Sequence, residues 1–400
     1  MGSPMQTKRI AILGSTGSVG RQALEIIAGE ERFSACALAA GSNWELLAEQ
    51  AGRSGAEFVA IADAARADDL AAALPAAAEL LTGDDALGEL VRRARPDMVL
   101  TAVVGSAGLA PTLAAIDCGA DLAVANKESL VMGGAVIMPA ARRAGVRVLP
   151  VDSEHSAIFQ CLAGHRREDV RRIVLTASGG PFRTHTAEQV RDASLKEVLN
   201  HPTWRMGRKV TVDSATLMNK TMEVVEAHWL FDLPGEQIEV VIHPESVVHG
   251  LVEFRDGSVL AQMGQPSMAT PIAFALYYPE RAPRAAAELG LPALGSLHFE
   301  PVDQERFRAL RLGYEAIRRG PAAGAALNAA NEVAVEAFLA GELQFGRIVE
   351  IVEEVLNQAG LKTEVSLDML LAADADARRL TRETIARDAS RSGKAARPAV

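Results

Sequence analysis

Short apolar runs alternate with amphipathic segments over residues 8–151 of the chain. Five of the runs have the length and composition of buried strands, and they cover residues 8–13, 33–40, 58–62, 98–104 and 121–125. Most of them end in a glycine-containing or polar turn, and the segments between them are rich in alanine or have helical spacing. Because strands that alternate with helices build parallel sheets, the pattern predicts an α/β fold with a doubly wound sheet. Ligands of such sheets bind beyond the carboxyl ends of the strands.

The pattern changes after residue 151 and predicts further domains. Apolar runs at 171–177 and 238–242, and a hairpin turned at Asp256-Gly257, indicate a second sheet. Between the two runs, residues 211–214 form a plausible N-cap of a helix that continues to about Phe231. Residues 302–385 then show helical spacing in four blocks. We therefore predict the following division: an N-terminal domain over 1–151, a central α/β catalytic domain over 152–278, a proline-containing linker over 279–300, a C-terminal helical domain over 301–390 and a disordered tail over 391–400.

Composition and charge exclude several classes of protein. With 49% hydrophobic and 23% charged residues, the chain has the composition of a soluble, folded protein. Its net charge of −10 argues against a nucleic-acid-binding surface. No apolar run has the length of about 18 residues that indicates a membrane span, and no signal-peptide pattern opens the sequence. The three cysteines have no metal-binding spacing. We predict a cytoplasmic protein with no nucleic-acid or membrane partner.

The first strand leads into a glycine turn, Gly14-Ser15-Thr16-Gly17-Ser18-Val19-Gly20, that opens a helix. Glycines at this place let the backbone approach a pyrophosphate, and the helix offers free N–H groups to it. The alternative is a purely structural turn between strand and helix. The second strand ends in Gly41-Ser42-Asn43, without the acidic residue that binds the ribose of NAD. The sequence thus predicts a Rossmann-like domain that prefers NADP.

Two carboxylates, Asp152 and Glu154, follow the apolar run 148–151. If the strand continues through them, their side chains project to the same side, where a hard divalent cation would neutralise them. The alternative is a loop whose acids cap the next helix. A third acid, Glu223, shares a helix face with Asn219 and Lys220, and a solvated Lys–Glu pair is the alternative there. All-oxygen ligands favour Mg²⁺ or Mn²⁺ over Zn²⁺.

Three further segments carry polar groups at positions where ligands bind. Asn126, Lys127 and Glu128 follow the strand 121–125, with helix capping as the alternative reading. Residues 178–182 form a small-residue turn that offers donors to an anion. The segment 200–207 contains His201 and Trp204 without clear periodicity, which indicates a mobile lid over a ligand or an ordinary surface loop.

Seven motifs, in this order, resemble those of the 1-deoxy-D-xylulose 5-phosphate reductoisomerase family. They are Gly14 to Gly20, Ala125-Asn126-Lys127-Glu128-Ser129-Leu130, Val151-Asp152-Ser153-Glu154-His155, Ser178-Gly179-Gly180-Pro181-Phe182, His201 to Gly207, Asp213 to Lys220, and Leu327-Asn328-Ala329-Ala330-Asn331-Glu332. The resemblance spans nearly the whole chain. It implies an NADPH-dependent oxidoreductase that uses Mg²⁺ or Mn²⁺ and produces 2-C-methyl-D-erythritol 4-phosphate in non-mevalonate isoprenoid biosynthesis. It also implies a homodimer that is a target of fosmidomycin.

The resemblance also implies roles for individual residues. The metal ligands would be Asp152, Glu154 and Glu223, which with Lys127 form the catalytic set. NADPH would contact Thr16, Gly17, Ser18, Val19, Gly41, Ser42, Asn43, Asn126, Glu128 and Gly207. The phosphorylated sugar would contact Lys127, Ser153, Glu154, Ser178, His201, Trp204, Ser214, Asn219 and Lys220. Two other functions remain compatible with the residues: a metal-independent NADP dehydrogenase, and a nucleotide-sensing protein without catalysis.

Overall fold

The computed structural model describes residues 7–283, 285–359 and 365–391, which divide into two compact units. Unit 1 comprises Met1–Ser129, Ile137–Gln160 and Ser267–Leu289, and unit 2 comprises Leu130–Val136, Cys161–Pro266 and Gly290–Val400. Within these described ranges, no helix combines the length and the apolar character that crossing a membrane requires. The disordered tail predicted over 391–400 lies, apart from Arg391, outside the described residues.

Unit 1 contains a parallel sheet of seven strands in the order β4-β3-β2-β1-β5-β6-β7. The strands are β1 (Lys8–Leu13), β2 (Phe33–Ala40), β3 (Phe58–Ile61), β4 (Glu79–Leu81), β5 (Met98–Thr101), β6 (Asp121–Val124) and β7 (Val148–Pro150). The chain starts in the middle of the sheet, runs outward to β4 and returns to β5 beside β1. The carboxyl ends of β1 and β5 therefore flank the point where strand order reverses, which is where such sheets bind ligands.

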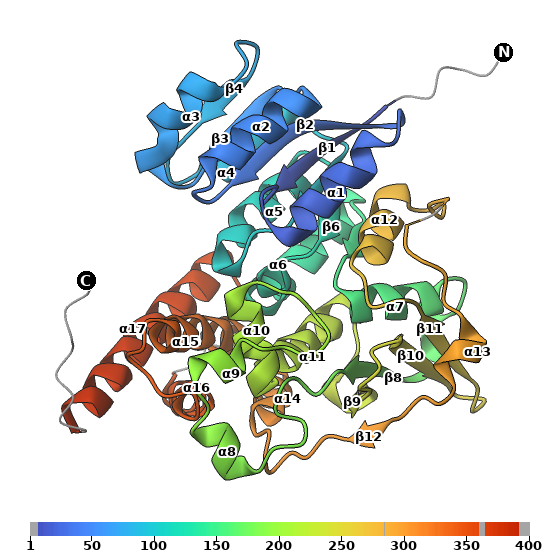
Figure 1. The fold of residues 1–400 in the computed structure, drawn as a ribbon, viewed down its shortest axis with the longest axis vertical. Helices are drawn as coiled ribbons and strands as arrows, with labels where there is room; N and C mark the ends of the chain where they lie inside the picture. The colour runs from blue at the N-terminus through green and yellow to red at the C-terminus, as the bar shows by residue number, and fades with distance from the viewer. Residues whose placement is uncertain (1–6, 284, 360–364, 392–400) are drawn as a thin grey trace. The chain divides into compact units, whose positions relative to one another are not determined.

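Helices cover both faces of this sheet, as right-handed crossovers require. The helices of this unit are α1 (Ser18–Ala28), α2 (Trp44–Ser54), α3 (Ala67–Ala73), α4 (Ala86–Ala94), α5 (Leu109–Asp117) and α12 (Ala269–Tyr277). Helices α6 (Lys127–Ala144) and α7 (Ser153–Leu162) lie only partly in it, since residues 130–136 and 161–162 belong to unit 2. Helix α4 packs on α5, whereas α2 packs on α3. In Figure 1, α12 lies beside α1 although the two are far apart in the sequence. Buried Ile272 and Leu276 attach α12 to the core of unit 1, which explains why residues 267–289 belong to this unit.

Unit 2 contains a mixed sheet of five strands in the order β11-β10-β8-β9-β12. The strands are β8 (Val170–Ala177), β9 (Ile238–Ile242), β10 (Val248–Phe254), β11 (Val259–Met263) and β12 (Glu300–Pro301). Strands β10 and β11 form the predicted antiparallel hairpin. The helices are α8 (Ala187–Arg191), α9 (Leu195–Val198), α10 (Arg208–Thr216), α11 (Met218–Phe231), α13 (Leu291–Leu294), α14 (Ala309–Arg319), α15 (Pro321–Leu339), α16 (Arg347–Gln358) and α17 (Leu367–Arg391).

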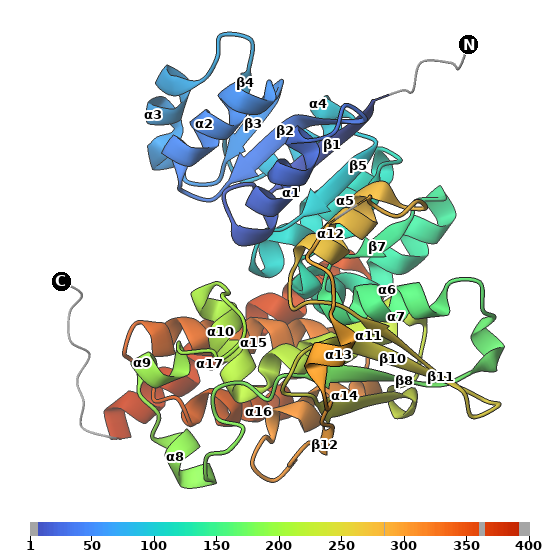
Figure 2. The ribbon, with the colours of Figure 1, turned by 45° about the vertical axis from the view of Figure 1, so that its right-hand side comes forward.

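The last four of these helices correspond to the four blocks of helical spacing in the sequence. Helix α17 runs along α15, as Figure 2 shows. Their apolar residues share one core with those of α10 and α11. The predicted α/β architecture with a C-terminal helical region is thus confirmed.

The helix predicted to end near Phe231 is confirmed at that end, but the N-cap predicted at 211–214 is wrong, since these residues lie inside an earlier helix. The chain forms α10 and α11 instead, separated by Leu217 with φ of 59°. A leucine rarely adopts this left-handed backbone, so periodicity gives no sign of the break. Burial of Leu217 and Met218 in the core of unit 2 holds the chain in this conformation.

Candidate active site

The glycine turn after β1 is held in place by close backbone contacts within unit 1. The N–H groups of Gly14 and Ser15 both donate to the carbonyl oxygen of Ala39, at 2.8 Å each. Gly14 has φ of +91°, and a Cβ there would lie 2.4 Å from the Ala102 oxygen just after β5. A Cβ on Gly20 would lie 2.3 Å from the Gly14 oxygen. The turn therefore requires glycine at positions 14 and 20, and this close backbone packing at the sheet's ligand-binding edge fits a pyrophosphate.

The second predicted cofactor segment lies at the end of β2. Gly41, Ser42 and Asn43 are exposed. The Asn43 side chain accepts a hydrogen bond of 3.2 Å from the Leu46 N–H and so caps α2. No acidic side chain stands at positions 41–43. The segment therefore leaves room for a 2′-phosphate, as NADP requires.

Asn126, Lys127 and Glu128 lie at the start of α6, just after β6. Asn126 caps the helix by accepting from the Ser129 N–H at 3.2 Å, and it donates to the carbonyl oxygens of Val103 and Gly105 at 2.9 and 3.0 Å. It also donates to the Glu128 carboxylate at 2.9 Å. The capping interpretation of Asn126 thus holds, and its side chain additionally joins the ends of β5 and β6. Its capping role does not exclude contact with a cofactor at this edge.

The strand conformation predicted for Asp152 and Glu154 is wrong. Strand β7 ends at Pro150, and α7 begins at Ser153. The carbonyl oxygen of Asp152 accepts from the Ser156 N–H at 2.8 Å, so Asp152 is the residue before the helix. Both acids are partly buried, and Lys127 forms an ion pair with Asp152. A helix start explains the i, i+2 spacing, because its free N–H groups favour negative charge.

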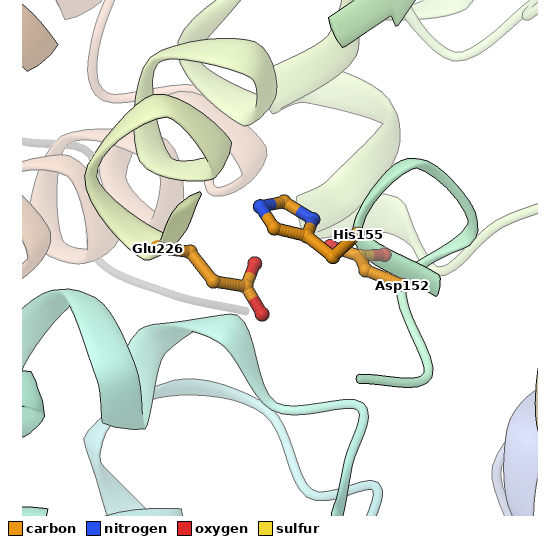
Figure 3. A group of neighbouring side chains, drawn as sticks. All are labelled: Asp152, His155 and Glu226. Carbon is orange, nitrogen blue, oxygen red and sulfur yellow. The ribbon is translucent and has the colours of Figure 1, made fainter. Parts of the chain in front are cut away.

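Figure 3 shows Asp152 and His155 at the start of α7, together with Glu226 on α11. Within unit 1, a carboxylate oxygen of Asp152 and a ring nitrogen of His155 lie within 4.8 Å of each other. His155 is completely buried, at 0% exposure. The sequence interpretation gave no role to His155, although its i, i+3 spacing from Asp152 places both on one helix face.

In unit 2, the Glu223 carboxylate is buried beside a lysine ammonium. Its side chain is 1% exposed and forms an ion pair with Lys220, whose side chain is 4% exposed. Asn219 donates a hydrogen bond to the same carboxylate. The three side chains therefore meet on one face of α11, as the spacing predicted. The alternative of a solvated Lys–Glu pair is excluded by this burial.

The turn after β8 lies against Ser214. Gly180 has φ of +66°, and a Cβ on it would lie 2.7 Å from the Ser214 carbonyl oxygen. The Gly180 N–H donates to the Ser178 hydroxyl oxygen at 3.2 Å. Ser178 and Ser214, which are far apart in the sequence, are thus brought into neighbouring positions within unit 2. Small hydroxyl side chains beside backbone N–H groups form a suitable environment for a phosphate.

His201 fixes the start of the segment 200–207. Its Nδ1 accepts from the N–H groups of Thr203 and Trp204 at 3.1 and 2.9 Å. Nδ1 therefore carries no proton, and Nε2–H donates to the Ser178 hydroxyl at 3.2 Å. Burial lowers the pKa of His201 below its ordinary 6.5, which favours this neutral form. Trp204 is half-buried, and Gly207 precedes α10.

A buried charged network that the sequence interpretation missed supports Ser214. Asp213 is 0% exposed, forms an ion pair of 2.9 Å with Lys209, and accepts from Asn331 of α15 at 2.8 Å. Asn331 lies in the seventh motif, and its side chain reaches across to α10. Glu226, one turn after Glu223, is a second buried acid of α11. Its i, i+3 spacing from Glu223 was visible in the sequence.

Three family models match the chain. They describe 1-deoxy-D-xylulose 5-phosphate reductoisomerase over residues 10–134, the C-terminal domain of the same enzyme over 148–231, and the DXP reductoisomerase C-terminal domain over 263–380. Among curated relatives, the 1-deoxy-D-xylulose 5-phosphate reductoisomerase of Burkholderia multivorans is 50% identical over 390 residues, covering 96% of this chain and 98% of the relative. The relative of the same name from Geobacillus is 47% identical and covers 94% of this chain and 100% of the relative.

Solved structures of the same enzyme resemble the fold. The Zymomonas mobilis structure in complex with NADPH has a TM-score of 0.88 and 43% identity, covering 95% of this chain and 99% of that one. A structure of DOX-P reductoisomerase with NADPH, fosmidomycin and magnesium has a TM-score of 0.88 and 40% identity, covering 95% and 98% of the two chains.

Proposed function

The chain belongs to the 1-deoxy-D-xylulose 5-phosphate reductoisomerase family, and we infer that it catalyses that family's reaction. It rearranges and reduces 1-deoxy-D-xylulose 5-phosphate to 2-C-methyl-D-erythritol 4-phosphate with NADPH and a divalent metal ion, in non-mevalonate isoprenoid biosynthesis. The observation that carries this conclusion is the identity of 50% to an enzyme of this name over 96% of the chain.

We propose that NADPH binds at the carboxyl edge of the unit 1 sheet. Its contacts would be Thr16, Gly17, Ser18, Val19, Gly41, Ser42, Asn43, Asn126 and Glu128 of unit 1, with Gly207 of unit 2. The glycine turn, where a Cβ on Gly14 would clash, fits a pyrophosphate group. When bound, NADPH supplies the hydride for the reduction.

We propose Asp152, Glu154 and Glu223 as ligands of Mg²⁺ or Mn²⁺. The donors are all carboxylate oxygens, which these hard cations prefer. Asp152 and Glu223 each form an ion pair with a lysine ammonium at positions with little exposure. When bound, the ion supplies Lewis-acid polarisation of the substrate carbonyl.

The phosphate of the substrate is assigned to unit 2. Ser178, Ser214, Asn219 and Lys220 offer hydroxyl, amide and ammonium donors, and the contact between Gly180 and Ser214 supports their grouping. His201 donates its Nε2 hydrogen to the Ser178 oxygen, so Ser178 can donate its own hydroxyl hydrogen to a phosphate. Binding energy at this end of the sugar orients the carbons that react at the other end.

Lys127, Ser153, His201 and Trp204 complete the proposed site. Lys127 Nζ is held by Asp152 at a position where only 8% of its side chain is exposed. An ammonium in such a place can hold a proton for an oxygen on which negative charge develops. Ser153 follows Asp152 at the start of α7, while Trp204 and His201 would exclude water by covering the ligand.

Two further properties belong to the proposal. We propose that the enzyme is a homodimer and that it works in the cytoplasm, both in line with the family resemblance. Light scattering coupled to size-exclusion chromatography tests the first of these, with a mass of twice 42.3 kDa expected. Fractionation of the source cells tests the second.

One assay tests the proposed activity. Purified protein should oxidise NADPH when 1-deoxy-D-xylulose 5-phosphate and Mg²⁺ or Mn²⁺ are both present, and fosmidomycin should stop the oxidation. The product should have the mass and NMR spectrum of 2-C-methyl-D-erythritol 4-phosphate. A metal-independent dehydrogenase would oxidise NADPH equally well after chelation, and a sensor protein would bind NADPH without consuming it.

A further inference from the structure

The glycine turn is also contacted by a side chain from the next helix. Gln50, on the second turn of α2, is 7% exposed and directs its amide at Ser15, which is 0% exposed. The Ser15 hydroxyl donates to Gln50 Oε1 at 2.7 Å, and Gln50 Nε2 donates to the Ser15 carbonyl oxygen at 3.0 Å. The oxygen and the nitrogen of the Gln50 amide thus both form hydrogen bonds with Ser15. Two hydrogen bonds between the same two residues fix both the position and the orientation of Ser15, because rotating either residue would break at least one of them.

The contact determines which groups of the turn remain for a ligand. The Ser15 N–H is donated to Ala39, its hydroxyl to Gln50, and its carbonyl oxygen accepts from Gln50. Ser15 therefore has no donor left to direct at a pyrophosphate. The Gly17 N–H donates to the Gly14 carbonyl oxygen at 3.1 Å, so the groups that remain nearest the edge of the turn belong to Thr16 and to exposed Ser18.

Helix α2 connects the two proposed parts of the cofactor site. Its first turn is capped by Asn43, in the segment assigned to the ribose end of NADPH. Gln50 lies seven residues further along, a rise of about 10 Å in a helix. A rigid helix with one end at the ribose segment and Gln50 at the pyrophosphate turn fixes the spacing between these two subsites.

We propose that Gln50 is a positioning residue for the cofactor: it holds the Gly14–Gly17 turn, through Ser15, in the conformation that accepts the NADPH pyrophosphate. This role rests on the proposed NADPH site and deepens it. It makes Gln50 a determinant of NADPH affinity, although Gln50 itself touches neither the cofactor nor the substrate.

The Gln50→Leu variant tests this role, because leucine keeps the size of the side chain and removes both hydrogen bonds. NADPH binding is measured directly from its fluorescence, without substrate. We expect the Kd for NADPH to rise about tenfold, as the loss of two buried hydrogen bonds from one conformation suggests. At saturating NADPH, kcat and the KM for the sugar phosphate should stay within about twofold of wild type, since only ground-state cofactor binding is affected.

Three companion variants make the result specific. Ser15→Ala removes the hydroxyl alone and should raise the Kd for NADPH by less than Gln50→Leu does. The double variant Ser15→Ala/Gln50→Leu should have the same Kd as Gln50→Leu, since both changes act on one contact. Glu49→Gln is the matched control, an exposed neighbour on α2 that should leave the Kd unchanged. If Gln50→Leu fails to fold, the Kd for NADPH is measured in Ser15→Ala and Gln50→Glu instead. Gln50→Glu replaces the donor to the Ser15 carbonyl oxygen with an acceptor.

An unchanged Kd in folded Gln50→Leu or Gln50→Glu overturns the role, and so does a loss of kcat with an unchanged Kd. Strict additivity of Ser15→Ala and Gln50→Leu also contradicts it. If the wild-type protein binds no NADPH, the proposed function itself fails, which this experiment distinguishes from failure of the Gln50 assignment alone.

Discussion

The glycine turn of unit 1 and the polar face of α11 in unit 2 are built by different physical means. In unit 1, the glycine turn is shaped by absent side chains and by neutral hydrogen bonds, such as those of Ser15 with Ala39 and Gln50. In unit 2, buried charges hold the site: Lys220 pairs with Glu223, and Lys209 pairs with Asp213. A site made by shape depends on sterics, whereas a site made by charge depends on protonation and on the ligand's own charge. Variants of the two units should therefore fail in different ways.

The largest effect is expected for Glu223→Gln. The substitution removes a carboxylate charge while keeping the size of the side chain, so the proposed metal site loses one of its ligands. We expect turnover to fall about a thousandfold or more, with the Kd for NADPH unchanged because unit 1 is intact. Near-normal Mg²⁺-dependent turnover would remove Glu223 from the metal site. Glu236→Gln, at an exposed acid of unit 2, is the control.

The second largest effect is expected in unit 1, where NADPH binding should weaken while metal binding persists. In Gly14→Ala, the new Cβ would lie 2.4 Å from the Ala102 oxygen at a φ of +91°, so the turn must shift. Strain of this kind costs about 1–3 kcal/mol before the clash is counted. We expect the Kd for NADPH to rise about a hundredfold. Binding of Mn²⁺ should persist, and wild-type NADPH affinity in this variant would show that the turn is not the pyrophosphate site.

Asn331→Leu tests the support of Ser214 by the C-terminal helices. It leaves a buried carboxylate oxygen of Asp213 without its amide donor, at a cost of about 1–3 kcal/mol of stability. We expect a lower Tm and a higher KM for the sugar phosphate, with unchanged NADPH affinity. Exposed Glu336→Gln on the same helix should alter none of these. A normal KM for the sugar phosphate in folded Asn331→Leu would show that the contact between Asn331 and Asp213 contributes only to stability.

The smallest effect is a pH dependence that originates at His201. Because burial lowers the pKa of His201 below 6.5, the folded protein binds this proton less readily than the unfolded chain. The stability that the neutral ring provides is present above 6.5 and is lost as pH falls through the lowered pKa. A proton on Nδ1 would also oppose the N–H groups of Thr203 and Trp204.

We therefore expect the KM for the sugar phosphate to rise several-fold as the assay pH falls below 6.5, while the Kd for NADPH stays flat. His201→Asn, whose side-chain oxygen can replace Nδ1 as acceptor, should reduce this dependence. An identical pH profile in the variant would place the titrating group elsewhere.

The comparison also shows what the sequence could predict. The strands, the glycine turn and the Asn219–Lys220–Glu223 face depend on local composition and spacing, and all of them are found in the structure. The helix break at Leu217 was missed, since tertiary packing determines it, whereas the helix start at Ser153 agrees with the alternative in which the acids cap the next helix. Gln50 was missed, and so was the partner of Asn331, because a polar residue in a helix acquires its role from a partner far along the chain.

Direct measurement of metal binding tests the central claim most directly. Mn²⁺ is titrated into the wild-type protein and into the Glu223→Gln and Asp152→Asn variants, with NADPH and fosmidomycin present, and bound ion is counted by electron paramagnetic resonance. The account predicts one tightly bound Mn²⁺ per wild-type chain and strongly weakened binding in both variants, which alter different units. Unchanged Mn²⁺ affinity in either variant would contradict the assignment of these carboxylates to one metal site.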